Sequence, residues 1–83
     1  MTDQANTVRA SVPGIFYRRP DPDSEVFVNP GDEVEPGTVV GLVEVMKQFH
    51  EIRTESAGRI GEFLVDNEET VAVGQPIVPL EET

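Results

Sequence analysis

The chain has 83 residues, no cysteine, and a formal net charge of −10 from 16 acidic and 6 basic residues. A chain of this length forms one small domain with a thin core, and without cysteine it has no disulfide, thiolate metal site or cysteine nucleophile. The strong negative charge repels nucleic-acid phosphates and anionic lipid headgroups, so neither a nucleic acid nor a membrane is expected as a partner. The composition suits the reducing cytoplasm, where we expect the protein to be located.

The first segment, residues 1–7, lacks the basic and apolar regions of a signal peptide. We expect it to be a disordered leader in front of one folded domain over residues 8–83. The stretch YRRPDPDSEV (17–26) contains two prolines and three acids, which is typical of a loop and not of a strand.

The middle of the chain is punctuated by two turn signals. Residues 29–32 and 35–38 each place Pro and then Gly at the centre, which predicts type II turns on either side of a short strand at Val34. The run 39–46 is rich in β-branched residues and has no helical period, so it predicts a strand buried on both faces, with 49–55 as its partner.

The last third predicts further strands at 60–65, near Val71 and at 77–80, with a turn at 66–69. Seven or eight short strands without a helix indicate an all-β sandwich or flattened barrel.

An internal repeat relates the two halves of the chain. Residues 30–44 align with 67–81 at an offset of 37, whereas 13–16 align with 57–60 at an offset of 44. The first half therefore contains seven additional residues, and they must lie in the loop over residues 17–26.

The link between strands 39–46 and 49–55 is too short for anything but a tight hairpin, so we expect Lys47 to project into solvent. Around it, Glu44-Val45-Met46-Lys47-Gln48 resembles the attachment segment of biotinyl domains, whose usual form is Glu-Ala-Met-Lys-Met. In addition, residues 12–34 are similar to the opening of the biotin carboxyl carrier family of acetyl-CoA carboxylase, including its inserted loop, called the thumb. The resemblance covers roughly residues 8–81.

This resemblance implies a biotinyl carrier domain with two four-stranded antiparallel sheets, approximate two-fold symmetry and the lysine on a hairpin tip. Lys47 would carry covalent biotin, the only cofactor expected, added by a biotin protein ligase that reads the flanking residues Glu44, Val45, Met46 and Gln48. The implied partners are a biotin carboxylase subunit and a carboxyltransferase subunit, between which the non-catalytic carrier, monomeric when isolated, moves carboxybiotin. The whole enzyme would be acetyl-CoA carboxylase or a related carboxylase of another acyl-CoA or a small amide. The implied thumb comprises Arg18, Arg19, Pro20, Asp21, Pro22, Asp23, Ser24 and Glu25, and it would contact the biotin ring or a partner, or simply be a solvated connection.

Several alternatives stay open. Lipoyl carriers of 2-oxo acid dehydrogenase type complexes share the hairpin architecture, but they typically have Asp before the lysine and lack the thumb. An unmodified acidic interaction module is the second alternative. Glu44 serves either the fold or ligase recognition. His50, the only histidine, is interpreted as a strand surface residue, and no catalytic or metal site is expected.

Overall fold

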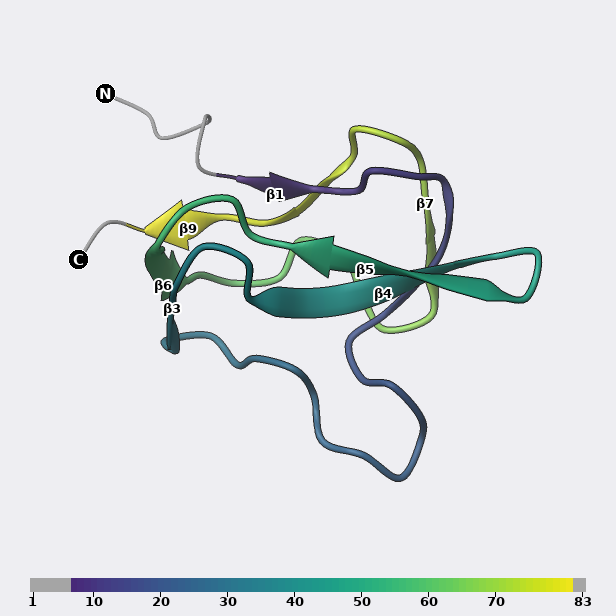
Figure 1. The fold of residues 1–83 in the computed structure, drawn as a ribbon, viewed down its shortest axis with the longest axis horizontal. Coiled ribbons are helices and arrows are strands. Elements are labelled where there is room, and N and C mark those ends of the chain that lie inside the picture. Colours follow the sequence, from purple (N-terminus) through teal and green to yellow (C-terminus); the bar gives the residue numbers. More distant parts are fainter. Residues whose placement is uncertain (1–6, 82–83) are drawn as a thin grey trace.

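A computed structural model describes residues 7–81, which form nine short β-strands and, within this range, no helix (Figure 1). Accordingly, this part of the chain offers no helix long and apolar enough to cross a membrane. The strands are β1 (Val8–Arg9), β2 (Gly14–Tyr17), β3 (Glu33–Val34), β4 (Val39–Val45), β5 (Gln48–Arg53), β6 (Gly58–Ile60), β7 (Glu69–Val71), β8 (Pro76–Val78) and β9 (Leu80–Glu81).

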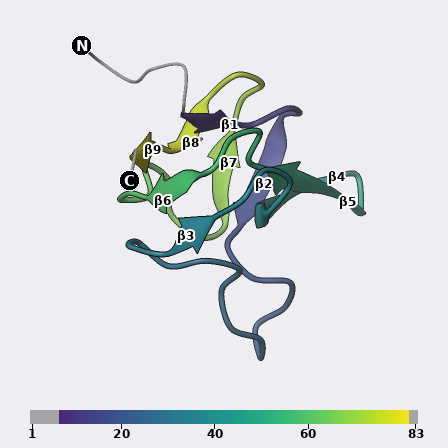
Figure 2. The same ribbon diagram turned by 60° about the vertical axis from the view of Figure 1, so that its left-hand side comes forward.

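The strands form two antiparallel layers, seen apart in Figure 2. One layer is a four-stranded sheet in the order β5-β4-β2-β7, and the other consists of β3-β6-β9 and the pair β1-β8. The second layer is divided where Pro79 separates β8 from β9, because proline has no N–H to continue the ladder. Across this break, the Gly61 N–H still donates to the Pro79 carbonyl at 2.9 Å. The predicted all-β fold with two layers is confirmed, with the second sheet interrupted at this proline.

Hydrogen bonds repeat between the two halves at the offsets found in the sequence. The Gly37 N–H donates to the Thr54 carbonyl at 2.7 Å, and the Gly74 N–H donates to the Ala10 carbonyl at 2.8 Å. Gly74 is the repeat mate of Gly37, and Thr54 is the mate of Ala10. The approximate two-fold symmetry is therefore present in the backbone bonding as well as in the sequence.

The predicted turns are also confirmed. Gly31 and Gly37 have φ of 95° and 90°, as the third residue of a type II turn requires. The turn at 66–69 closes with a hydrogen bond of 3.2 Å from the Glu69 N–H to the Asp66 carbonyl. Its third residue, Glu68, has φ of 71° although it is not a glycine. The same turn geometry is thus kept in the second half with a less suitable residue.

The core lies between the layers, with the fully buried Phe16 of β2 near its centre. The Phe63 ring packs 6.2 Å from that of Phe16, between centroids. On the neighbouring strand, Gly41 leaves room for Phe16, because a Cβ atom there would lie 2.4 Å from the Phe16 ring. The remaining core is mainly aliphatic, including Val40, Val43, Ile52, Ile60, Val71, Ile77, Val78 and Leu80.

Some expected boundaries were wrong. The strand predicted at 60–65 ends at Ile60, because the following residues bend, bringing Phe63 over the core, and bond to the β8–β9 segment instead. The strand β1 was not predicted. In the hairpin, β4 ends one residue earlier than the predicted 39–46, and β5 is shifted toward the tip and shorter than the predicted 49–55. Residues 1–6 of the expected leader lie outside the described residues.

Candidate functional site

The hairpin tip is a two-residue turn. Strands β4 and β5 remain paired up to Val45 and Gln48, which leaves only Met46 and Lys47 in the connection. Their φ angles are 51° and 69°. Positive φ at both central residues is the signature of a type I′ turn, whose twist matches that of the two flanking strands.

This turn is unfavourable for the residues that occupy it. Type I′ turns prefer Asn and Gly, and a residue with a side chain held at positive φ costs about 1 kcal/mol or more. The burial of Val40, Val43 and Ile52 in the two strands joined by the turn offsets this conformational cost. Local strain of this kind, retained at a solvent-exposed position, is typical of a site with a function.

Lys47 is exposed to solvent, as predicted, and the neighbouring Met46 is 91% exposed. Neither of the two ion pairs found within residues 7–81 involves Lys47. In Figure 1 the β4–β5 tip extends at one end of the molecule, opposite β9. Lys47 is also the only lysine of the 83 residues, so its side chain is the only ε-amine that this sequence offers to a modifying enzyme.

The flanking residues differ in their surroundings. Glu44 lies between β2 and β5, opposite Ile15 on one side and Phe49 on the other. Val45 is half-buried and packs against the core, whereas Gln48 is exposed. Only Met46 and Gln48 of the four predicted recognition residues therefore present most of their surface to an approaching protein.

Glu44 is held by Tyr17. The Tyr17 hydroxyl donates a hydrogen bond of 3.0 Å to Glu44 Oε1, and the Tyr17 ring lies 6.0 Å from the Phe49 ring, between centroids. The hydrogen bond to the Glu44 carboxylate, with smaller contributions from burial and from the negative charges of Glu44 and Glu68, raises the pKa of Tyr17 above its ordinary value. Glu44 thereby connects the base of the hairpin tip to β2, which gives it a structural part.

The predicted thumb is an ordered loop that projects from the two layers (Figures 1 and 2). At its base the Phe27 N–H donates to the Arg18 carbonyl at 2.9 Å. At its tip Asp21 accepts hydrogen bonds from the Asp23 N–H at 2.9 Å and from the Ser24 hydroxyl at 3.0 Å. These local bonds fix the shape of the loop without burying it.

A groove of about 410 Å³ separates this loop from the hairpin. It is lined by Tyr17, Arg19, Pro20, Asp21, Pro22, Phe49, Asn67 and Glu68. The thumb residues among these were predicted, but the other four were missed. Glu68 could have been singled out from the sequence, because it occupies the place of Gly31 in the repeat. Tyr17, Phe49 and Asn67 come from strands and turns that only the tertiary fold brings together.

His, Asp and Glu side chains form no metal-holding group in the described part of the chain. Residues 7–81 contain no group of three or more His, Cys, Asp or Glu side chains placed to hold a metal ion. His50 lies half-buried in β5 opposite Val43, consistent with its interpretation as a strand residue.

Comparison with known proteins gives consistent matches. Among the curated relatives, the biotin carboxyl carrier protein of acetyl-CoA carboxylase from Chlamydia muridarum is 44% identical over 64 residues, covering 77% of this chain and 39% of that protein. Those from Nostoc and Pseudomonas aeruginosa are each 39% identical, covering 86% and 87% of this chain and 39% and 46% of theirs. The chain thus spans less than half the length of these relatives.

Solved structures show the same fold at lower identity. The urea carboxylase of Kluyveromyces lactis matches 96% of this chain and 6% of its own, with a TM-score of 0.77 and 22% identity. An aspartoacylase family protein of Mesorhizobium loti matches 95% of this chain and 23% of its own, with a TM-score of 0.71 and 24% identity.

The model of the family described as "Biotin-requiring enzyme" (Biotin_lipoyl) matches residues 6–80, nearly all of the sequence. With its two-layered fold and its lysine at an exposed hairpin tip, the chain therefore belongs to the biotin and lipoyl attachment family of biotin-requiring enzymes.

Proposed function

We propose that this chain is a biotin carboxyl carrier, in which a biotin protein ligase attaches biotin to Lys47. The observation that carries this proposal is the exposed Lys47 at a two-residue turn in which both residues have positive φ. The carrier itself is non-catalytic and presents the attached group to a biotin carboxylase and then to a carboxyltransferase.

The residues at the tip fit this cofactor. Attachment requires an amine that a second enzyme can reach and deprotonate, and a protruding turn offers it without unfolding of the domain. Biotin, once bound as an amide, supplies a ring that accepts a carboxyl group at one active site and releases it at another. The chain contributes the tether and the stable scaffold, so that both encounters occur at high effective concentration.

The relatives favour a particular carboxylase. Those reported above are named carriers of acetyl-CoA carboxylase, which supports acetyl-CoA as the acceptor and a multi-subunit enzyme as the setting. The net charge of −10 favours a monomeric carrier in isolation and complementary basic surfaces on the two partner enzymes.

The thumb has a supporting role in this proposal. The groove between the loop and the hairpin lies beside Phe49, two residues from Lys47, and is lined partly by Pro20 and Pro22. This groove would hold the biotin ring between the two transfer reactions. Backbone NMR spectra of the biotinylated and unmodified proteins test this role. We expect the signals of Arg19, Asp21 and Phe49 to shift on biotinylation, whereas unchanged signals would assign the loop to partner contacts or to a simple connection.

The attachment itself is tested by producing the chain together with an active biotin ligase and measuring its intact mass. We expect an increase equal to one biotinyl group in the wild type and none in Lys47→Arg. The substitution lies in an exposed turn, so it should change the free energy of unfolding by about 0.5 kcal/mol or less. An unmodified wild-type chain would overturn the proposal.

The same measurement separates the alternatives. A lipoyl carrier would gain a lipoyl group when produced with a lipoyl ligase and would remain unmodified by the biotin ligase. An unmodified interaction module would gain neither. Met46 before the lysine and the loop over residues 18–25 favour biotin over lipoate.

A further inference from the structure

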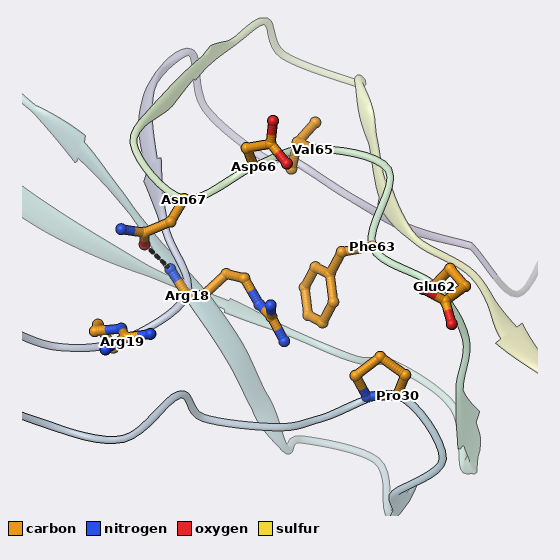
Figure 3. A pocket seen from close by; sticks show the side chains of 8 residues that line it. All are labelled: Arg18, Arg19, Pro30, Glu62, Phe63, Val65, Asp66 and Asn67. Carbon is orange, nitrogen blue, oxygen red and sulfur yellow. Dashed lines mark hydrogen bonds between the residues drawn. The ribbon is translucent and has the colours of Figure 1, made fainter.

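A second cavity, of about 270 Å³, lies on the other side of the thumb base and takes no part in the proposed carrier cycle. Figure 3 shows it from close by, between the start of the loop and the segment that follows β6. Its walls are formed by Arg18, Arg19, Pro30, Glu62, Phe63, Val65, Asp66 and Asn67.

Arg18 and Arg19 differ from Arg53 and Arg59, which form ion pairs with Glu51 and Glu33. Like the side chain of Arg9, which donates to the Gly74 carbonyl, their side chains donate only to backbone carbonyls in the described part of the chain, Arg18 to Val28 at 3.2 Å and Arg19 to Ser24 at 3.5 Å. Arg18 and Arg19 form no ion pair within residues 7–81, although the protein carries 16 acidic residues. In such an acidic chain, two arginines that are consecutive in sequence and both lack a carboxylate partner call for an explanation.

Each of the two side chains also has a buried N–H donor without a hydrogen-bond acceptor. The Nε atoms of Arg18 and Arg19 are buried and have no hydrogen-bond partner. A charged N–H group in this state is unfavourable, and native proteins usually provide an acceptor, an ion or a ligand for it.

The Arg18 side chain is nevertheless firmly positioned. Its guanidinium carbon lies 4.2 Å from the centroid of the Phe63 ring, a cation–π contact. Its Nη2 donates to the Val28 carbonyl at 3.2 Å, and its backbone N–H donates to Asn67 Oδ1 at 2.8 Å. Arg18 is thus oriented before any ligand arrives, which lowers the entropy lost on binding.

The two acids of the wall do not neutralise the pair. Figure 3 shows the side chains of Glu62 and Asp66 directed away from the Arg18 guanidinium. The two arginines of the lining are therefore not bonded to either of these carboxylates.

We propose that this cavity is a binding site for an oxyanion, a group with carboxylate or phosphate oxygens, held by Arg18 and Arg19. Planar guanidinium groups bind such oxygens with paired, charge-assisted hydrogen bonds. The anion comes either free from solution or as the side chain of an acidic residue on a docked protein, and the chemistry of recognition is the same.

Titration of the unmodified full chain, observed by NMR at the arginine Nε–H signals, tests this site. Inorganic phosphate and acetate are each added against sodium chloride of matched ionic strength. We expect saturable shifts at Arg18 and Arg19 with phosphate or acetate. Shifts that do not saturate, or that chloride reproduces, would overturn the proposal.

A capped tripeptide of aspartate and glutamate distinguishes the two sources. Tighter binding of this peptide than of acetate would identify the side chain of a docked protein as the ligand. Equal or weaker binding, together with saturable phosphate shifts, would identify a free anion.

Variants provide the matched comparison. Arg19→Gln should weaken binding about tenfold or more, since it removes a charge-assisted bond. Arg59→Gln removes the same charge from β6, outside the cavity, and should leave the affinity unchanged. Arg18→Lys keeps the charge but loses the planar fork, and it should also weaken binding. Equal affinity in Arg19→Gln and Arg59→Gln would contradict the assignment.

The site does not depend on Lys47. Lys47→Arg should bind phosphate as the wild type does, so the proposal of the anion site and the proposal of biotin attachment are tested independently.

Discussion

The two halves of the chain share a backbone but differ in what extends from it. In the first half ten residues, 17–26, separate Phe16 of β2 from Phe27, and β4 runs on into the Met46-Lys47 tip. In the second half β6 is followed by only three residues before the mate of Phe27, and no hairpin follows β9 within the described part. Both additions belong to the same half, where they enclose the groove lined by Tyr17 and Phe49. The repeated part forms the core, and the unrepeated parts form the groove and the hairpin tip on which the proposed carrier function rests.

The two halves also differ in backbone strain at one matched turn. The turn that holds Gly31 in the first half holds Glu68 in the second, with φ of 95° and 71°. The repeat therefore supplies matched positions at which the same substitution can be compared in the same backbone, and the following expectations use these pairs.

The largest effect is expected for the core mates Phe16 and Ile60, which are 0% and 1% exposed. Phe16→Ala should lower the free energy of unfolding by about 4 kcal/mol and Ile60→Ala by about 3 kcal/mol. Urea denaturation measures both. A loss below about 1 kcal/mol in only one of them would show that the halves do not share a single core.

A smaller effect is expected at the turn mates Gly37 and Gly74, whose φ angles are 90° and 82°. A Cβ atom would meet nothing within 4 Å at either position, so the cost of alanine comes from the backbone alone. Gly37→Ala and Gly74→Ala should each destabilise by about 1 kcal/mol. An unchanged melting temperature in Gly37→Ala would contradict the turn assignment.

The opposite sign is expected for Glu68→Gly. Glycine relieves the positive φ, although it also adds entropy to the unfolded chain, so the net gain should be about 0.5 kcal/mol. Thermal unfolding beside Thr70→Gly, a substitution at an exposed position of β7, provides the control, which should show no gain. Destabilisation by Glu68→Gly would show that the glutamate side chain makes a stabilising contact.

The smallest effect concerns Tyr17, the only tyrosine in a chain without tryptophan. Its raised pKa, due first to the hydrogen bond with Glu44, predicts that its phenol ionises above pH 10 in the folded protein. Because the folded pKa exceeds the unfolded one, the stabilisation is complete below pH 10 and is lost as pH rises through the folded value.

Ultraviolet titration of the phenolate follows this ionisation directly. Glu44→Gln should return the Tyr17 midpoint toward its ordinary value, whereas Glu33→Gln, on β3, should not change it. Identical midpoints in the wild type and Glu44→Gln would remove Glu44 from this role.

Local sequence signals predicted much of the fold. The Pro-Gly pairs located two turns, because a turn depends on residues adjacent in sequence. The inserted loop was located by comparing the two halves of the chain along the repeat. The division of the second sheet at Pro79 and the bend after Ile60 were missed, since a short apolar run such as 60–65 does not reveal where strand pairing ends. The exposed Lys47 was predicted from the short hairpin link, but the groove and the anion site required the tertiary contacts of Asn67 and Phe63.

The most direct test of the carrier function is a tryptic digest of the chain after treatment with biotin ligase, ATP and biotin. Trypsin cleaves after a free lysine but not after a biotinylated one. We predict a fragment spanning residues 19–53 that is uncut at Lys47 and heavier by one biotinyl group. Complete cleavage after Lys47, or biotin found only at the N-terminal amine, would contradict the account.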